Sequence, residues 1–295
     1  MANSPKASVQ HWCEYLGIRI TLGLLSILPF RWRGALIARI ARLIVPLAAG
    51  PRRRMMRNLE LIYPQMPTAE KRKLIQDVAS NAARALSELL MNKSYRYRHD
   101  LFDATGPGLQ ILQEQARKGK GAIIVSAHFG QWEAIRHFLK KRGMETGAIY
   151  RKNSNPLYED LFLHNIQFGG SPIVPRGPAG NRTMVKHLKA GGFFALLVDQ
   201  KVHADAMVPF MGVAAQTTTS PAALALKYDL PIVPAFAARL KDGISIEIEF
   251  QEPIKPSDIL TMTQDINDRI GEKVKADPSQ WYWMHKRWES PEISY

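Results

Sequence analysis

The sequence predicts an α/β fold, with a central mixed sheet flanked by helices, and three observations support this. Residues 122–125 and 193–198 are short apolar runs of the length expected for buried strands. Segments with apolar residues at helical spacing alternate with such runs from residue 108 onward. Glycines such as Gly143 stand where these helices are expected to end. Alternating segments of these lengths predict one sheet with helices on both faces.

Positive charge is concentrated at the start of the chain. The 295 residues carry a net charge of +14, from 40 Lys and Arg against 26 Asp and Glu. Residues 1–66 contain ten of the basic residues but only two acids, Glu14 and Glu60, so more than half of the excess charge lies there. A basic surface attracts anionic lipid, nucleic acid or an acidic protein.

Two apolar runs, residues 20–30 and 34–50, lie within this basic region. Neither reaches the ~18 to 20 uninterrupted apolar residues of a spanning helix, and no signal-peptide cleavage site follows the first. We therefore expect amphipathic helices in a membrane interface, and the basic cluster 52–54 favours an anionic membrane surface at the cytoplasmic face. A single spanning anchor and a buried helical hairpin remain alternatives. Nucleic acid is not expected as a partner, because no nucleic-acid-binding motif is present.

Residues 1–66 are thus expected to form a membrane-associated helical region, and residues 67–295 the α/β domain. Thr68 is the expected N-cap of a helix that continues to about Met91, and a polar connector follows at residues 92–103. Further helices are expected at 108–118, about 132–142, 155–168, 183–190, 221–227 and 257–275, and further strands at 146–150, 172–174, 231–237 and 244–250. The last helix is expected to bury Ile259, Leu260, Ile266, Ile270 and Val274.

A histidine and a glutamate follow the first apolar strand. His128 stands in the turn after residues 122–125, and Glu133 lies in the first turn of the next helix. Loops at the carboxyl ends of strands carry the chemistry of α/β proteins. A neutral imidazole there can take a proton from a hydroxyl, and a carboxylate can orient it. His128 and Glu133 are therefore candidate catalytic residues. A structural histidine and a first-turn acid favoured by the helix dipole remain the alternatives.

Polar residues also follow other predicted strands. Asp199 and Gln200 come after residues 193–198, and Arg151 and Arg176 follow two shorter strands. Strand ends on one edge of a sheet converge, so these candidate substrate-binding residues are expected to line one cleft with the histidine. Arginine binds phosphate oxygens bidentately, which favours a phosphorylated substrate.

The sequence lacks the motifs of several other kinds of enzyme. The chain has no GxSxG, HExxH, GxGxxG or CxxC, and its eight histidines show no metal-ligand spacing, so no metal is expected. The GKG at residues 119–121 is not part of a phosphate-binding loop motif. Cys13 is the single cysteine, cannot form an internal disulfide, and is expected to be a small apolar filler.

The segment 128–133, His-Phe-Gly-Gln-Trp-Glu, resembles the HX4E variant of the HX4D motif of glycerolipid acyltransferases, specifically of the lipid A late acyltransferases of Gram-negative bacteria, which transfer lauroyl and myristoyl groups. Five further blocks resemble that family in order: Arg57-Asn58-Leu59 with Tyr63-Pro64, Tyr150-Arg151 with Asn155-Pro156, Asp199-Gln200 with Val208-Pro209-Phe210, Thr217 to Thr219, and Trp283-Met284-His285-Lys286-Arg287. The HX4E motif alone is weak evidence for the family. Six blocks in order, which cover most of the chain, are strong evidence. Lys201 departs from the family pattern, which usually has an acidic residue there.

The resemblance implies a glycerol-3-phosphate acyltransferase-like sheet. It also implies transfer of an acyl group from acyl carrier protein to a hydroxyl of a phosphorylated glycolipid at the cytoplasmic face of the inner membrane. His128 would be the general base, Glu133 its partner or an acceptor-binding group, Arg151 and Arg176 would lie near acceptor phosphates, and Asp199 would be a structural or acceptor-side carboxylate. A thioester donor needs a base and an oxyanion site, so no cofactor is expected.

Two alternatives stay open from the sequence. One is an acyltransferase that acts on another membrane lipid, a lysophospholipid or an aminolipid. The other is a non-catalytic basic protein that binds membranes.

Overall fold

The computed structural model describes residues 7–201 and 206–289. Its helices are α1 (Val9–Ile27), α2 (Phe30–Ile44), α3 (Ala49–Ile62), α4 (Thr68–Leu90), α5 (Pro107–Arg117), α6 (Glu133–Lys141), α7 (Pro156–Ile166), α8 (Pro178–Lys189), α9 (Ser220–Tyr228) and α10 (Ile259–Ala276). Its strands are β1 (Phe102–Thr105), β2 (Ala122–Ser126), β3 (Thr146–Tyr150), β4 (Ile173–Pro175), β5 (Phe193–Leu197), β6 (Ala206–Phe210), β7 (Val213–Thr217), β8 (Ile232–Arg239) and β9 (Ile246–Phe250). Short 3₁₀ turns lie at η1 (Val45–Leu47), η2 (Asn92–Tyr97), η3 (His99–Leu101), η4 (Gln167–Gly169) and η5 (Pro278–Gln280).

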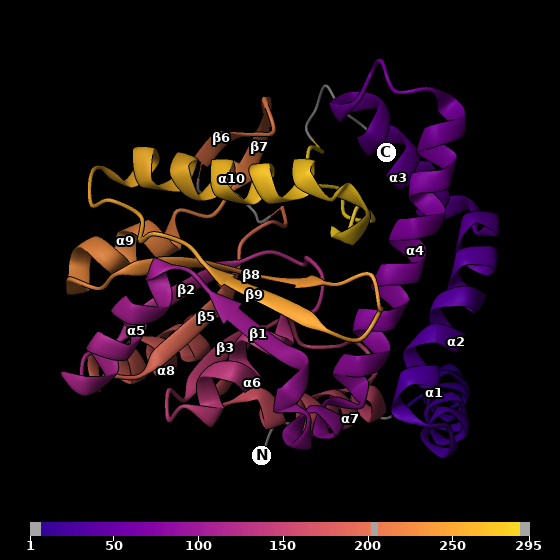
Figure 1. The fold of residues 1–295 in the computed structure, drawn as a ribbon, viewed down its shortest axis with the longest axis horizontal. Helices are drawn as coiled ribbons and strands as arrows, with labels where there is room; N and C mark the ends of the chain where they lie inside the picture. The colour runs from indigo at the N-terminus through magenta and orange to yellow at the C-terminus, as the bar shows by residue number, and fades with distance from the viewer. Residues whose placement is uncertain (1–6, 202–205, 290–295) are drawn as a thin grey trace.

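Seven of these strands form one mixed sheet in the order β1-β9-β8-β2-β5-β3-β4. The five strands from β8 to β4 run parallel. β9 is antiparallel to β8, and β1 is parallel to β9. The carboxyl ends of the five parallel strands therefore meet at one edge, and α4 stands across that edge (Figure 1). This arrangement confirms the mixed sheet flanked by helices.

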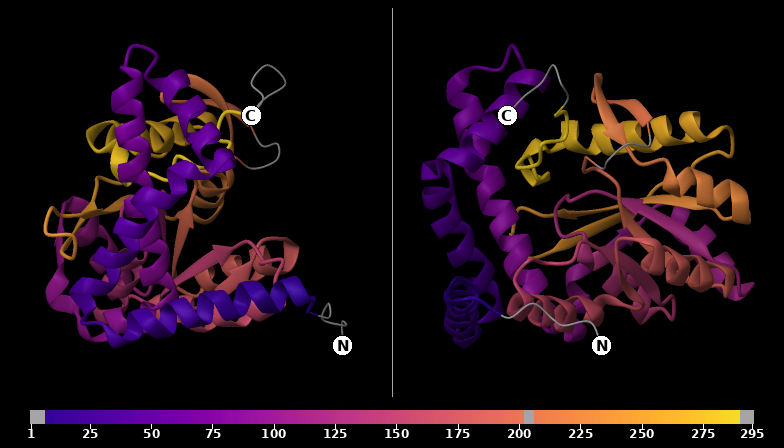
Figure 2. Two further views of the ribbon diagram at one scale, coloured as in Figure 1. Left: turned by 90° about the vertical axis from the view of Figure 1, so that its right-hand side faces the viewer. Right: turned by 180° about the vertical axis from the view of Figure 1, so that it is seen from behind.

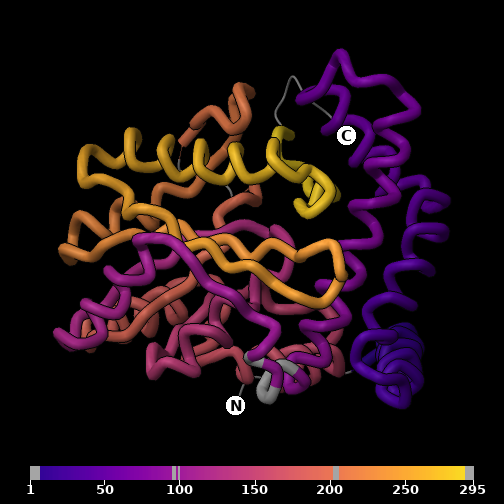
Figure 3. Tube along the Cα trace, in the orientation of Figure 1, coloured from indigo at the N-terminus to yellow at the C-terminus, as the bar shows by residue number. Residues whose placement is uncertain are grey.

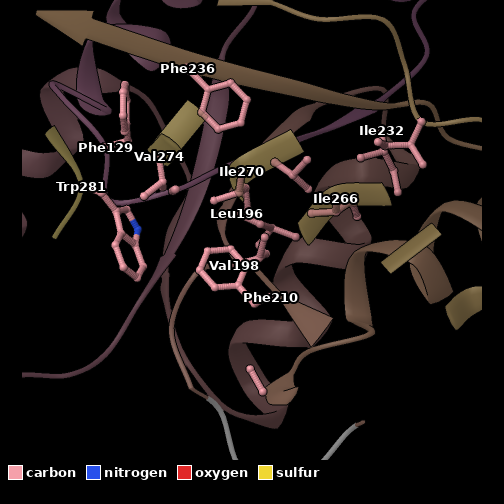
Figure 4. Close-up of a cluster of buried hydrophobic side chains, with 14 of the residues drawn as sticks. Phe129, Leu196, Val198, Phe210, Ile232, Phe236, Ile266, Ile270, Val274 and Trp281 are labelled. Carbon is pink, nitrogen blue, oxygen red and sulfur yellow. The ribbon is translucent and has the colours of Figure 1, made fainter. Parts of the chain in front are cut away.

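An apolar core covers each face of the sheet. One core lies under α5 and α6, where Leu112 and Phe138 pack with Ile124 of β2. The larger core lies under α8, α9 and α10, and includes Met184 of α8 and Leu196 of β5. Figure 4 shows part of this larger core, in which side chains of α10 meet those of β5 and β8. Because neighbouring residues of a strand point to opposite faces, β2 and β5 supply both cores.

α1 and α2 lie beside α4, on the side away from the sheet (Figure 3). α2 packs against α4 and buries only small residues, Gly34, Ala38 and Ala41. α1 runs along α7 (Figure 2), and Asn155 at the start of α7 donates a hydrogen bond to the His11 carbonyl, 2.9 Å away. Large apolar side chains of α1 and α2 point outward; they are Val9, Trp12, Leu16, Ile20, Leu24, Ile27, Trp32, Leu36, Ile40, Leu43 and Ile44. We call these residues the N-terminal apolar face.

No single helix of the described chain is long and apolar enough to cross a membrane. The segments Phe30–Leu47 and Ala49–Ile62 reach that length and composition only as a pair, and they are bent by 86° at their break. α3 contributes Met55 and Leu59, both fully buried, to the larger core. The larger core therefore includes residues on both sides of residue 66, where the boundary between the helical region and the α/β domain was predicted.

Most predicted elements are present, with small shifts at their ends. Asn155 caps α7 by accepting from the backbone N–H groups of Leu157 and Tyr158. Gly143 follows α6 with a φ of 75°, as its place at the helix end predicted. α8 starts at Pro178, five residues before the predicted helix start at residue 183.

Four expectations were wrong. Thr68 is the first residue of α4 rather than its cap, because Pro67 precedes the helix and no side chain caps it. Phe102 and Asp103, placed in a connector, begin β1 at the edge of the sheet. Ile259 and Leu260 are exposed in the first turn of α10, which extends beyond the core. Cys13 is exposed rather than a filler, because α1 packs on its neighbours through other residues.

Candidate active site

His128 follows β2 and is held through its backbone as well as its ring. Its N–H donates to Asp199 Oδ2 at 3.0 Å, and its carbonyl accepts from the Tyr282 N–H at 3.0 Å. The turn that follows passes so close to β8 that a Cβ at Gly130 would lie 2.0 Å from the Ala237 carbonyl oxygen. Gly130 also has a φ of 54°, a left-handed conformation that glycine adopts without cost. The turn that places the His128 imidazole therefore requires glycine at residue 130.

The carboxylate that contacts this imidazole is Asp199, which follows β5, the neighbour of β2. Asp199 Oδ1 lies 2.9 Å from His128 Nδ1. Asp199 is fully buried, and its Oδ2 also accepts a hydrogen bond from Trp281 Nε1 at 2.9 Å. Burial opposes its negative charge, but attraction to His128 and hydrogen bonds from it lower the pKa of Asp199 well below its usual value. The charged carboxylate thus favours a hydrogen on Nδ1 and leaves Nε2 as the basic nitrogen.

Gln200 lies between two imidazoles. Its Nε2 is 3.1 Å from His128 Nε2 and also contacts His285 Nε2. Burial, together with the nearby charge of His128, lowers the pKa of His285 to about 4, so His285 is neutral at neutral pH. Asn58 of α3 fixes the segment that carries His285, because its Nδ2 donates to the carbonyls of Trp283 and His285, each at 2.8 Å.

Glu133 does not contact His128. It is the first residue of α6 and pairs with Arg136 one turn later, with 2.8 Å between Oε2 and Nη1. Burial raises the pKa of Glu133, and Arg136 partly offsets this effect. Arg136 also donates to the carbonyls of Thr146 and Gly170, so it ties α6 to β3 and to the turn before β4. The expected catalytic partnership of Glu133 with His128 is therefore not what the structure shows.

A cavity of about 240 Å³ brings the remaining predicted residues together. His128, Glu133, Arg151, Arg176 and Gln200 all line it, as the convergence of strand ends predicted. Asp199 is fully buried and does not line this cavity. The other walls are mainly apolar and come from both helices and strands, including Leu86, Leu89, Ile124, Ile135, Phe162 and Leu197. We call this space the histidine cavity.

Two arginines contribute positive charge at this cavity. Arg151 follows β3 and Arg176 follows the neighbouring strand β4, so the sheet places them side by side. Partial burial and the charge of Arg151 lower the pKa of Arg176, whereas Asp199 counteracts both. Two guanidinium groups this close favour an anion between them, and a phosphate group fits their planar donors.

No cluster of three or more His, Cys, Asp or Glu side chains suited to a metal ion occurs among residues 7–201 and 206–289.

The family model for bacterial lipid A biosynthesis acyltransferases matches residues 4–290. The chain belongs to this family. Curated relatives match the chain along nearly all of its length. The lipid A biosynthesis lauroyltransferase of Escherichia coli is 26% identical over 98% of this chain and 97% of its own. The E. coli lipid A biosynthesis myristoyltransferase is 21% identical over 94% and 87%.

The chain is also similar to more distant proteins. A phosphatidylinositol mannoside acyltransferase of Mycobacterium tuberculosis is 22% identical over 61% of this chain and 58% of its own. A crystal structure of the 1-acyl-sn-glycerophosphate acyltransferase of Thermotoga maritima aligns with 92% of this chain and 99% of its own, at a TM-score of 0.37 and 13% identity.

Three residues that were not predicted from the sequence complete the site of this lipid A biosynthesis acyltransferase family member. Trp281 donates to Asp199, His285 contacts Gln200 beside His128, and Asn58 donates to the carbonyl of His285. Two of them occur in blocks that carried the family resemblance, and this was the available signal. Their contacts join α3, the strand ends and the C-terminal segment, which lie far apart in the sequence, so no local pattern indicates them.

Proposed function

We propose that this acyltransferase family member transfers a fatty acyl group from acyl carrier protein to a hydroxyl of a lipid A precursor or a related phosphorylated glycolipid. The observation that carries the proposal is the hydrogen-bonded His128–Asp199 pair on the wall of an apolar cavity that two arginines also line. Family membership and the names of the relatives support lipid A as the acceptor class.

The proposed chemistry starts at His128 Nε2. An acceptor hydroxyl takes the position at Nε2 that the Gln200 amide now holds, and Nε2 removes its proton as the oxygen attacks the thioester carbonyl. Asp199 holds the ring in the required tautomer and stabilises the imidazolium that forms. The carbon–sulfur bond then breaks, and the thiolate leaves as the thiol after it takes the proton from Nε2. The products are an oxygen ester on the lipid and the free thiol of the carrier.

The cavity suits the acyl chain of the donor. The chain is attached to the carbonyl carbon that is attacked at His128, and the cavity that begins at His128 is walled by aliphatic and aromatic side chains. Burial of apolar chain surface is favourable by about 25 cal/mol per Å². Arg151 and Arg176 supply charge for a phosphate of the acceptor.

We also propose that the enzyme works on the cytoplasmic face of the inner membrane. The N-terminal apolar face leaves many large side chains exposed on α1 and α2, and such a surface on a soluble domain marks an interaction site. Arg52 and Arg53 of α3 line a separate open cavity next to the end of η1, together with Arg57 and Arg72. A cationic surface next to exposed aliphatics favours an interface of anionic lipid, and it also favours an acidic carrier protein.

The first prediction tests the pair. Replacing His128 with Ala should lower transfer by a factor on the order of 10² or more, because the general base is lost. Asp199→Asn should also lower it strongly, since an amide does not stabilise the imidazolium. The measurement is mass spectrometry of lipid products from purified protein, acyl-loaded carrier protein and a lipid A precursor.

His164→Ala is the matched control, because His164 is an exposed histidine of α7 away from the cavity, and it should keep full turnover. Near-normal turnover by His128→Ala would refute the mechanism. Parallel reactions with acyl-coenzyme A, a lysophospholipid or an aminolipid separate the donor and acceptor alternatives. If no lipid gains an acyl chain, the proposed function is refuted and the non-catalytic alternative is favoured.

A further inference from the structure

The backbone N–H groups of the turn after β2 already donate within the protein. All four from residue 128 to residue 131 have acceptors, which are Asp199 Oδ2 and the carbonyls of Ala127, Gln280 and Ala237. Acyl transfer moves negative charge onto the thioester carbonyl oxygen, and donors aimed at this oxyanion contribute much of the catalysis in such reactions. The turn that carries His128 therefore leaves the oxyanion to a donor from another part of the site.

The side-chain amide of Gln200 lies where such a donor is needed. Its Nε2 is 3.1 Å from His128 Nε2, and Gln200 lines the histidine cavity. In the proposed reaction the attacking oxygen binds at His128 Nε2, and in the tetrahedral intermediate the oxyanion is only two bonds away from that oxygen. A donor that contacts Nε2 directly is therefore within hydrogen-bond reach of the oxyanion once the acceptor hydroxyl takes its place at Nε2.

His285 holds the same amide. Gln200 Nε2 also contacts His285 Nε2, and because an amide nitrogen donates and does not accept, the ring nitrogen is the acceptor. Only a neutral imidazole can accept at Nε2, and burial lowers the pKa of His285 to about 4. The amide has two N–H groups, so one stays on His285 when the acceptor hydroxyl releases the other from His128.

The segment that carries His285 is itself fixed. Asn58 of α3 donates to the His285 carbonyl at 2.8 Å, and the His285 ring meets the Tyr282 ring edge-on, with 4.8 Å between centroids. The Tyr282 N–H in turn donates to the His128 carbonyl at 3.0 Å. The ring that holds Gln200 and the ring that takes the proton are thus tied to one segment. A donor that is fixed before the reaction needs no reorganisation when the charge develops.

We propose that the side-chain amide of Gln200 is the oxyanion donor of the acyl transfer, and that His285 is the positioning residue that holds this amide. This inference rests on the proposed function. As the carbon–oxygen bond forms, the acceptor proton moves to His128 Nε2 and the carbonyl electron pair moves onto the oxygen that Gln200 bonds. The pair returns when the carbon–sulfur bond breaks and the thiolate takes the proton. Gln200 and His285 neither gain nor lose a proton.

Steady-state kinetics of the intact protein with acyl-loaded carrier protein and a lipid A precursor test the role of Gln200. Gln200→Ala should lower kcat by a factor on the order of 10² to 10³, while the KM for each substrate changes by less than about threefold, because the lost bond forms only in the transition state. Gln113→Ala is the matched control, because Gln113 is an exposed glutamine of α5 that does not line the cavity. A raised KM with unchanged kcat would overturn the inference.

The ¹⁵N chemical shifts of the His128 ring separate oxyanion binding from an effect on the base. Asp199 and not Gln200 contacts Nδ1 as a carboxylate, so His128 in Gln200→Ala should keep its hydrogen on Nδ1. A change of tautomer in this variant would show that Gln200 acts through the imidazole, and the proposed oxyanion role would be wrong.

A double-mutant cycle tests the role of His285. His285→Phe keeps a planar ring but removes the acceptor, and it should lower kcat roughly tenfold or more. Gln200→Ala combined with His285→Phe should be no slower than Gln200→Ala alone, because His285 acts through Gln200. His285→Gln restores an acceptor oxygen and should recover part of the loss. Losses that multiply in the double variant would contradict the positioning role. If His285→Phe fails to fold, the same cycle with His285→Leu decides.

The wild-type protein separates this inference from the function on which it rests. A wild-type protein that acylates no lipid refutes the proposed function. A wild-type protein that acylates the lipid, together with a Gln200→Ala variant of nearly normal kcat, refutes only the oxyanion role of Gln200.

Discussion

His285 illustrates how the site sets the properties of a single residue. Its imidazole is partly buried, lies 5.5 Å from the His128 ring between centroids, and contacts Gln200. A charged imidazole there would lose hydration and meet the charges of His128, Arg176 and Arg54, and only Asp199 would favour it. His285 therefore stays neutral. The charged carboxylate of Asp199 then pairs with His128 and not with His285.

This lowered pKa predicts how stability depends on pH. In the unfolded chain His285 titrates near its ordinary value of about 6.5, whereas in the folded protein the pKa is about 4. Between these values the unfolded state binds more protons, so stability falls as the pH decreases from about 6.5 to 4, by roughly 2 to 3 kcal/mol from this residue. His285→Gln should remove that part of the slope in urea unfolding measured at several pH values.

The comparison with the variant isolates His285. Glu133, whose pKa is raised, binds protons more readily when folded and so acts with the opposite sign, but it is present in both proteins. An unchanged slope in His285→Gln would show that the imidazole is not held neutral by the fold.

At the scale of an element, α6 is fixed by a buried ion pair. Glu133 and Arg136 are almost wholly buried, and Arg136 also bonds carbonyls at both ends of the segment from β3 to β4. The segment from β3 to β4 includes Arg151, and Arg176 follows it, so this pair supports the arginines of the cavity. We infer that Glu133 is a positioning residue.

Removing the charge of Glu133 should therefore act mainly on stability. Glu133→Gln leaves a buried guanidinium without its ionic partner, which costs roughly 3 kcal/mol or more in the free energy of unfolding. Glu114→Gln is the control, because Glu114 pairs with Lys118 one turn later on α5 at 2.5 Å with both side chains exposed, and it should cost less than about 1 kcal/mol. The measurement is urea unfolding followed by circular dichroism. Normal stability with lost transfer would instead place Glu133 in the reaction.

Several elements can be predicted from local sequence patterns alone. The buried strands, the helix after His128 and the capped start of α7 follow from apolar periodicity and capping residues within a few positions. β1 is missed because its residues, Phe-Asp-Ala-Thr, have little apolar content and gain their strand form from pairing with β9.

At the scale of the whole molecule, α1 and α2, which carry the N-terminal apolar face, lie outside the α/β body (Figure 2). Its side chains are spaced three or four residues apart along α1 and α2, so they form one stripe on each helix. The opposite side of α2 packs on α4 through small residues. The stripe on α2 therefore lies close to the α/β body that holds the histidine cavity.

Membrane binding should depend on this face. Replacing Trp12, Leu16 and Ile20, which are 48%, 49% and 60% exposed, with Ser should weaken binding to phosphatidylglycerol vesicles by roughly tenfold or more, because less apolar surface is buried. Replacing three equally exposed residues elsewhere, Met207, Leu240 and Leu260, with Ser should change it little. Vesicle co-sedimentation measures both, and equal losses would contradict an N-terminal docking face.

The sequence by itself determined the α/β class, the strand ends that carry His128, Asp199, Arg151 and Arg176, and the family. These depend on patterns within a few residues, or on blocks that remain recognisable one at a time. Only the tertiary structure decided that Asp199 and not Glu133 is bonded to the imidazole. The reason is that β2 and β5 are neighbours in the sheet although about 70 residues separate them, whereas Glu133, five residues from His128, begins a helix and pairs along it.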